Sequence, residues 1–221
     1  MIPFSREAFL GVFERYNQDV WPMQIALVAL AVAAVLAARR GTPRSGRVAA
    51  GILAALWSWM GVVYHWLYFA PINPAAWAFG ALFVAQAALF VQSAVSGALR
   101  LALRRGPDAR LGEALIGYAL VVYPLLVYPL LGQLGDHGFP RSPSFGLPCP
   151  TTIFTLGVLT LAKQPVPRRL LVIPILWAAV GTTASFKFGI WEDLGLAIAA
   201  LLTVAARMLR RRASGCRSHP S

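Results

Sequence analysis

The sequence predicts an all-α membrane protein, a bundle of about seven transmembrane helices. Of its 221 residues, 58% are hydrophobic and only 13% are charged, whereas soluble domains are roughly one quarter charged. Seven apolar stretches fill most of the chain, and a helix needs about 20 mainly apolar residues to cross about 30 Å of hydrocarbon. The chain length therefore leaves room for one membrane domain and no soluble domain.

Residues 1–22, which precede the first apolar stretch, are predicted to form an amphipathic helix. Apolar side chains recur there at helical spacing between Phe9 and Val20. Ser5 can cap the helix, and Glu7 suits the positive end of its dipole. We expect this helix to lie flat on the outer membrane surface or to cover the bundle as a lid.

The apolar stretches give the predicted spans in chain order. The fifth is the shortest, and a re-entrant hairpin there is the alternative. Such a hairpin would move the basic loop 163–169 and the basic C-terminus to the outside, so seven spans are preferred. The predicted spans are 23–38, 48–69, 73–99, 111–134, 151–162, 170–188 and 191–209, and together they form a transmembrane domain over 23–209.

Basic residues are divided unequally between the connecting segments. Sixteen of the 20 Lys and Arg residues lie in four of them: 39–47, 100–110, 163–169 and 207–217. The positive-inside rule places these four segments in the cytoplasm and the N-terminus outside. Residues 210–221 are predicted to form a basic, disordered cytoplasmic tail.

The net charge of +12 raises the alternative of a nucleic-acid partner. Most of the basic residues, however, flank apolar spans, where they fix orientation and face anionic lipid. The sequence therefore indicates the lipid bilayer as the partner and argues against nucleic acid. It gives no indication of the oligomeric state.

Prolines interrupt two of the predicted spans. Two Tyr-Pro pairs, 123–124 and 128–129, lie in the fourth span, and Pro174 lies in the sixth. A proline inside a helix removes a backbone hydrogen bond and clashes with the preceding turn, so we expect strong kinks. The carbonyls exposed by a kink must then find partners in protein, water or a ligand.

His65 and Asn73 stand out in the predicted outer half of the bundle. His65, near the outer end of the second span, is interpreted as a ligand-binding, metal-binding or proton-carrying imidazole. The alternative is a histidine bonded to a neighbouring helix or to water. Asn73 either lines a cavity or only caps the third span, with Pro74 at its first position.

The stretch from Pro148 to Thr152 is the most unusual segment. Each proline disfavours helix at the residue before it, so an extended backbone is expected, followed by a cap at Thr151 or Thr152. A helix N-terminus that faces a watery cavity favours an anion; the alternative is a rigid turn. The candidate ligand-binding residues are therefore His65, Asn73, Cys149, Thr151 and Thr152.

A zinc site is the alternative use of the outer polar groups, because imidazole, thiolate and carboxylate can all bind zinc. No two of these residues have ligand spacing on one helix, so the sequence assigns no metal, cofactor or catalytic residue. The residues concerned are His65, Asp136, His137, Cys149, Glu192 and Asp193.

Several blocks of the chain match a family pattern. The blocks are 3–9, 16–17, 20–22, 64–66, 72–76 and 148–154. On these residues the chain resembles the bacterial integral membrane proteins of the domain of unknown function 6064 family, over nearly its full length. The resemblance implies a multi-span bacterial membrane protein and brings no known activity or functional residues.

The functional hypothesis from the sequence is a multi-pass protein of the bacterial inner membrane that binds or transports a small solute. The solute would enter an outward-facing cavity, because polar groups and broken helices gather in one leaflet. Two alternatives stay open: an intramembrane enzyme, which could use a metal, and a structural membrane subunit without a small ligand.

Overall fold

The computed structural model confirms the all-helical fold. It describes residues 3–97, 99 and 111–215, and this part of the chain contains no β-strand. The fifth and seventh predicted spans are the helices α7 (Pro148–Leu161) and α9 (Leu194–Gly215). Five further helical stretches, which match the other predicted spans, are long and apolar enough to cross a membrane: Met23–Arg40, Pro43–Phe69, Ala76–Ser96, Gly112–Leu134 and Arg169–Phe188.

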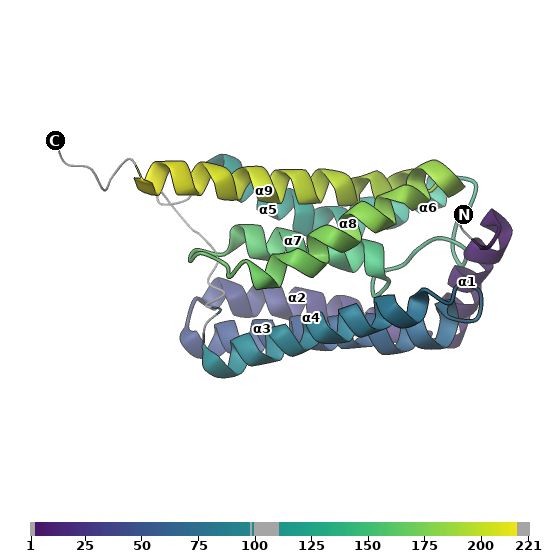
Figure 1. Ribbon diagram of the computed structural model, residues 1–221, viewed down its shortest axis with the longest axis horizontal. Helices are drawn as coiled ribbons and strands as arrows, with labels where there is room; N and C mark the ends of the chain where they lie inside the picture. Colours follow the sequence, from purple (N-terminus) through teal and green to yellow (C-terminus); the bar gives the residue numbers. More distant parts are fainter. Residues whose placement is uncertain (1–2, 98, 100–110, 216–221) are drawn as a thin grey trace.

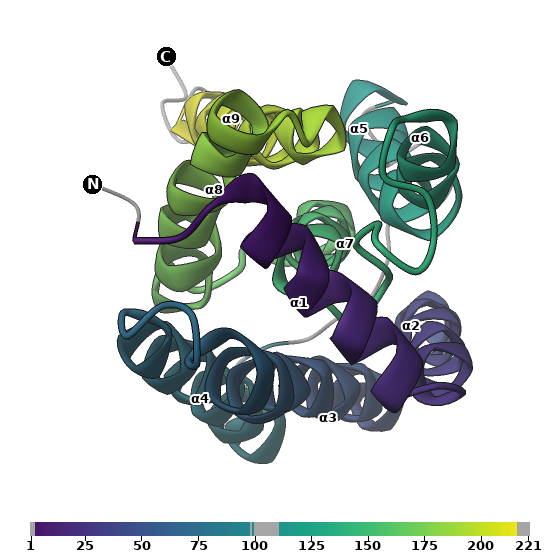
Figure 2. The same cartoon turned by 90° about the vertical axis from the view of Figure 1, so that its right-hand side faces the viewer.

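Helix α7 lies at the centre of the bundle. Every residue of α7 except Cys149 is buried. Because α7 contacts protein on all sides, it can carry threonines and needs only 14 residues. The helices around it, seen in Figure 2, are α2 (Met23–Arg40), α3 (Pro43–Trp59), α4 (Ala76–Ser96), α5 (Leu111–Val122), α8 (Arg169–Phe188) and α9.

Helix α1 (Arg6–Asp19) lies across one end of the bundle, as expected for a lid (Figures 1 and 2). Ser5 caps it as predicted, since its hydroxyl accepts a hydrogen bond from the Ala8 N–H at 3.1 Å. Its apolar face, including Leu10 and Phe13, is buried against the bundle. The α2–α3 and α7–α8 connections lie at the opposite end (Figure 1).

The second span begins five residues earlier than predicted, because Thr42 caps α3. The Ser45 N–H donates to Thr42 Oγ1 and the Thr42 N–H donates to Ser45 Oγ, each at 3.1 Å. This reciprocal capping box, followed by Pro43 at the first helical position, is a strong start signal. Gly41 adopts the left-handed conformation (φ 71°) that the tight turn requires.

Two segments wind as π-helix. The segment η3 (Tyr123–Val127) joins α5 to α6 (Tyr128–Leu134) and coincides with the Tyr-Pro repeat, where Pro124 and Pro129 have no N–H to donate. The segment η1 (Met60–Phe69) continues α3 and carries His65. The sequence predicted a helix interruption at η3, from its prolines, and none at η1.

The expectation of an extended backbone before each proline is confirmed at Leu147 and wrong at Cys149. Helix α7 begins at Pro148, and the extended residue is Leu147 (φ −82°, ψ 157°). The reason is that the N–H groups of a first helical turn have no intrahelical partner, so prolines in it remove no hydrogen bond. No side chain caps this helix, so neither Thr151 nor Thr152 has the predicted capping role.

The end of the chain also differs from the prediction. After the 3₁₀ turn η4 (Trp191–Asp193), helix α9 continues to Gly215, so residues 210–215 are helical and not disordered. Arg210, the first residue of this extension, donates hydrogen bonds to Glu113 on α5 and to the Ala162 carbonyl after α7. The rest of the predicted tail lies outside the described residues.

Candidate functional site

A cavity of about 450 Å³ lies beneath α1, at the end of the bundle that α1 covers. Its walls come from α1 and the residues before it, from η1, α4 and α8, and from the first turn of α7. It falls within the size range of small-molecule sites, roughly 300–1,000 Å³. Its lining is mainly aromatic: Phe4, Phe9, Phe13, Tyr64, Phe69, Phe79, Trp177 and Phe188. We call this space the α1 cavity.

Few polar groups reach the α1 cavity, and they are uncharged. Asn73 lines it from the turn before α4, where its side chain also accepts a hydrogen bond from the Ala75 N–H at 3.1 Å. Cys149 and Trp177 line it near Gly181, where a Cβ would lie 3.4 Å from Cys149 Sγ and 3.5 Å from Trp177 Nε1. The Trp177 Nε1–H bonds no oxygen or nitrogen and has only the Cys149 thiol, a weak acceptor, beside it, so it can donate to a ligand.

His65 does not line the α1 cavity. It is fully buried behind Phe79 and Trp177, with ring centroids 4.7 Å from Phe83 and 5.1 Å from Trp177. Neither of its ring nitrogens has a hydrogen-bond partner. This arrangement matches neither sequence interpretation, because the imidazole does not line the α1 cavity and neither ring nitrogen forms a hydrogen bond.

Thr151 and Thr152 are also buried away from the cavity. Thr151 Oγ1 accepts a hydrogen bond from the Gly146 N–H at 3.1 Å, and the Thr152 hydroxyl has no partner. Of the five candidate residues from the sequence, the α1 cavity therefore brings together Asn73 and Cys149 only.

Two buried carboxylates in the turn η4, just before α9, lie next to the cavity wall. Glu192 and Asp193 are 3% and 1% exposed. The Tyr128 hydroxyl donates to Asp193 Oδ1, and the Tyr123 hydroxyl donates to the Glu192 carbonyl at 2.8 Å. The Cys149 thiol of the cavity wall lies near Asp193, which Tyr128 joins to α6.

His137 links these carboxylates to α1. Its Nε2 lies 2.9 Å from Glu192 Oε1 and its Nδ1 lies 2.8 Å from Asp136 Oδ1. Asp136 in turn accepts two hydrogen bonds from Arg6, each at 2.8 Å, and Arg6 Nε donates to the Phe188 carbonyl at 2.7 Å. Each nitrogen of His137 thus bonds a different carboxylate.

The predicted zinc alternative finds no support in this geometry. Among the described residues, no three His, Cys, Asp or Glu side chains form a group that could hold a metal ion. His65 is surrounded by rings, and His137 points its two nitrogens at separate partners.

Further contacts hold α1 on the loop between α6 and α7. Arg141 forms ion pairs with Glu7 and Glu14 of α1. The buried Asn17 side chain donates to the carbonyls of Pro140 and Ser142 at 2.7 and 2.8 Å. Helix α1 is therefore fixed over the cavity by charge pairs and hydrogen bonds as well as by apolar contacts.

The residues that anchor α1 were not predicted from the sequence, although one signal was present. Arg6 and Arg141 are two of only four basic residues on the predicted outer side. Basic residues that depart from the positive-inside pattern need another explanation, and here each pairs with an acidic residue. Asn17 carried no comparable signal.

We predict that the protein loses stability as the pH rises from about 6 to about 8.5, around the ordinary histidine range. Burial lowers the pKa of His137, because it disfavours the charged form. The hydrogen bonds and negative charges of Asp136 and Glu192 have a larger combined effect, so the pKa of His137 is raised. A raised folded-state pKa contributes stability at low pH that is lost as the pH passes it. The Asp136 pKa is lowered, chiefly by its hydrogen bond to His137, so its own contribution is lost only in more acidic solution.

The measurement is the free energy of unfolding in detergent at both pH values, for the wild type and for His137→Gln. The variant should show a much smaller change between the two. An equal change in both proteins would assign the pH dependence to another group.

Comparison with known proteins gives one match. The model of a family described as "Family of unknown function (DUF6064)" matches residues 6–218. No curated protein and no solved structure matches the chain.

Proposed function

This chain belongs to the family of unknown function DUF6064, and we propose from its geometry that it is a multi-pass membrane protein that binds a small apolar molecule in the α1 cavity. The observation that carries the proposal is the lining of the cavity. Aromatic rings dominate it, and Asn73, Cys149 and Trp177 supply a few uncharged polar groups. Such a lining suits an apolar or aromatic molecule with one hydrogen-bond acceptor.

Binding at this end is better supported than passage through the bundle. Large side chains, among them Trp57, Phe83, Phe90 and Phe154, are fully buried in the core that continues from the cavity. Trp57 also donates a hydrogen bond to Thr155 on α7 at 3.0 Å. Transport would require this packed core to open, whereas binding requires only that the molecule pass α1.

We predict that filling the cavity abolishes binding. Ala184 lines the cavity from α8 and is 8% exposed, so Ala184→Phe places a ring in the ligand's space. The probe is a small aromatic diazirine, activated by light on the protein in lipid nanodiscs, with cross-links located by mass spectrometry. Wild type should be labelled at Phe9, Tyr64 and Trp177, and Ala184→Phe should lose most of this labelling.

Ala179→Phe is the matched control, because Ala179 lies on the same helix and is exposed. It should keep wild-type labelling of the cavity. If label appears only on exposed residues such as Val172 and Leu176, the cavity does not bind apolar molecules and a structural role without a ligand is favoured.

We also propose seven spans in the bacterial inner membrane, with α1 outside and the C-terminus in the cytoplasm. Charge supports this orientation, since the basic turns and the end of α9 lie opposite α1 (Figure 1). In a variant with both native cysteines replaced by serine, Phe139→Cys should react with an impermeant maleimide on intact cells. Gln164→Cys should react only after permeabilisation, and the reverse pattern would overturn the orientation.

A further inference from the structure

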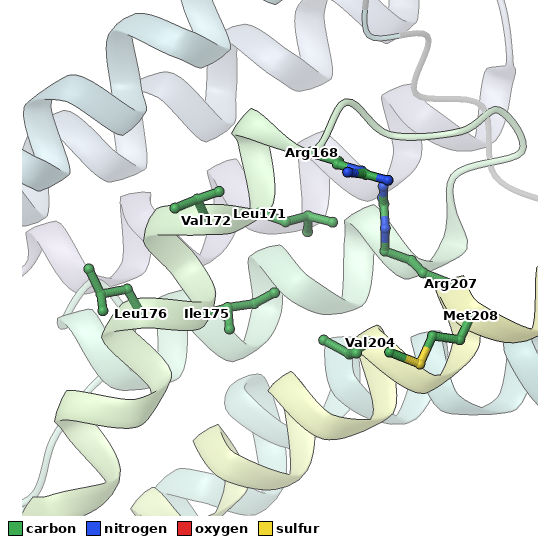
Figure 3. Close-up of a pocket in the computed structure, with 8 residues that line it drawn as sticks. All are labelled: Arg168, Leu171, Val172, Ile175, Leu176, Val204, Arg207 and Met208. Carbon is green, nitrogen blue, oxygen red and sulfur yellow. The ribbon is translucent and has the colours of Figure 1, made fainter. Parts of the chain in front are cut away.

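A second hollow lies between α8 and α9, at the end of the bundle opposite α1. It is a groove of about 500 Å³ whose walls are aliphatic, with contributions from Val172, Ile175 and Leu176 of α8 and Val204 of α9. Arg168 and Arg207 lie at one end of it (Figure 3). We call it the basic groove.

The two arginines of the basic groove point toward one another. Arg168 precedes α8 and Arg207 lies near the end of α9, and Figure 3 shows both side chains extending to the same end of the groove. An anion at this end of the groove is attracted by both positive charges. A phosphate group suits two guanidinium groups well, because each can donate two parallel hydrogen bonds.

The walls of the groove require an apolar occupant. Val172 and Leu176 are 61% and 50% exposed, on the outer surface of a helix long and apolar enough to cross a membrane. Surfaces of this kind are covered by acyl chains in a bilayer. The basic groove thus combines a site for an anionic head group with a site for a hydrocarbon chain.

We propose that the basic groove binds an anionic phospholipid. The phosphate lies between Arg168 and Arg207, and one acyl chain follows the groove between α8 and α9. Basic sites between helices at the cytoplasmic side of a membrane are typical of anionic lipid binding. The proposal is independent of the α1 cavity, which lies at the other end of the molecule.

The test is native mass spectrometry of the purified, delipidated protein in detergent, titrated with phosphatidylglycerol or with phosphatidylcholine. Wild type should bind one phosphatidylglycerol molecule more tightly than further molecules and more tightly than phosphatidylcholine. Arg168→Gln/Arg207→Gln should weaken this first binding step at least about tenfold. Both side chains are at least partly exposed, so the double variant is expected to fold.

The matched control is Arg40→Gln/Arg44→Gln, which removes two exposed arginines from the same end of the bundle. It should bind phosphatidylglycerol within about twofold of wild type. Equal losses in both double variants would mean that only surface charge attracts the lipid, and unchanged binding in the groove variant would also overturn the proposal.

Two further experiments distinguish a bound phospholipid from bound free phosphate. Ile175→Trp keeps both arginines but fills the groove, so it should also lose the first phosphatidylglycerol. Millimolar inorganic phosphate should not displace the lipid from the wild type. If Ile175→Trp binds normally or phosphate displaces the lipid, the groove is a phosphate site and not a phospholipid site.

Discussion

Replacing Gly157 with leucine is expected to destabilise the helix bundle by about 3 kcal/mol, at the upper end of the range for overpacked cores. Gly157 lies in the central helix α7, where it faces α5. A Cβ at this position would lie 2.9 Å from the Leu120 carbonyl carbon, from Leu120 Cβ and from Val121 N. Two of these atoms belong to the backbone, so no side-chain rotation can make room and α5 must move away from α7.

Helix α5, which faces α7, also requires a glycine at the contact. A Cβ on Gly117 of α5 would lie 2.4 Å from Leu161 Cγ and 3.3 Å from the Gly157 carbonyl oxygen. Glycines on both helices thus let α5 and α7 approach closely, as small residues do between membrane helices. Because α7 is the helix around which the others pack, separating it from α5 should disturb the whole bundle.

The measurement is the free energy of unfolding in mixed detergent micelles, with Gly51→Leu as the control. Gly51 also lies inside a helix, α3, but a Cβ there would meet nothing within 4 Å. Gly51→Leu should be neutral or slightly stabilising, because leucine favours helix more than glycine does. Similar losses in both variants would show that the effect comes from replacing any helical glycine and not from the α5–α7 contact.

Much of the fold could be predicted from the sequence because long apolar stretches have few other uses. The boundaries of α2, α4, α5–α6 and α8 follow from apolar length alone, within a few residues. Helix α7 was harder, since its 14 residues are buried by neighbouring helices and its length is not set by the membrane. Pro148 correctly predicted an extended Leu147, but Pro150 was misinterpreted, because the rule that disfavours helix before proline weakens in a first turn.

The candidate site could be predicted less well, for a physical reason. The sequence identified polar residues in one end of the bundle, and Asn73 and Cys149 do line the α1 cavity. Yet the cavity is built mainly from aromatic rings, which in a membrane protein cannot be told from packing residues by sequence. His65 drew attention as the polar residue of its span, whereas the structure surrounds it with rings.

Among the charged residues, Arg210 on α9 is expected to cause the largest loss of stability when it is replaced. Its side chain is 18% exposed and its Nε lies 2.6 Å from Oε2 of Glu113, which is 6% exposed. Arg210 also donates to the carbonyls of Thr160 and Ala162, which end α7. The guanidinium group of Arg210 therefore connects α9 to α5 and α7. It also forms an ion pair with the buried Glu113 carboxylate.

Arg210→Met should lower the free energy of unfolding by about 3–5 kcal/mol, the range for removing one partner of a buried ion pair. Two consequences add in this variant. The Glu113 carboxylate loses the charge that balances it, and the carbonyls of Thr160 and Ala162 lose a donor. Arg169→Met is the control, because Arg169 is exposed at the same end of the bundle and its loss should cost less than about 0.5 kcal/mol.

A double variant separates the two consequences. Glu113→Gln removes the buried charge, so Arg210→Met combined with Glu113→Gln should recover part of the stability lost in Arg210→Met alone. What is not recovered measures the hydrogen bonds to the end of α7. If the two substitutions are strictly additive, the Glu113–Arg210 pair contributes nothing of its own, and the connection between α9 and α7 would account for the whole effect.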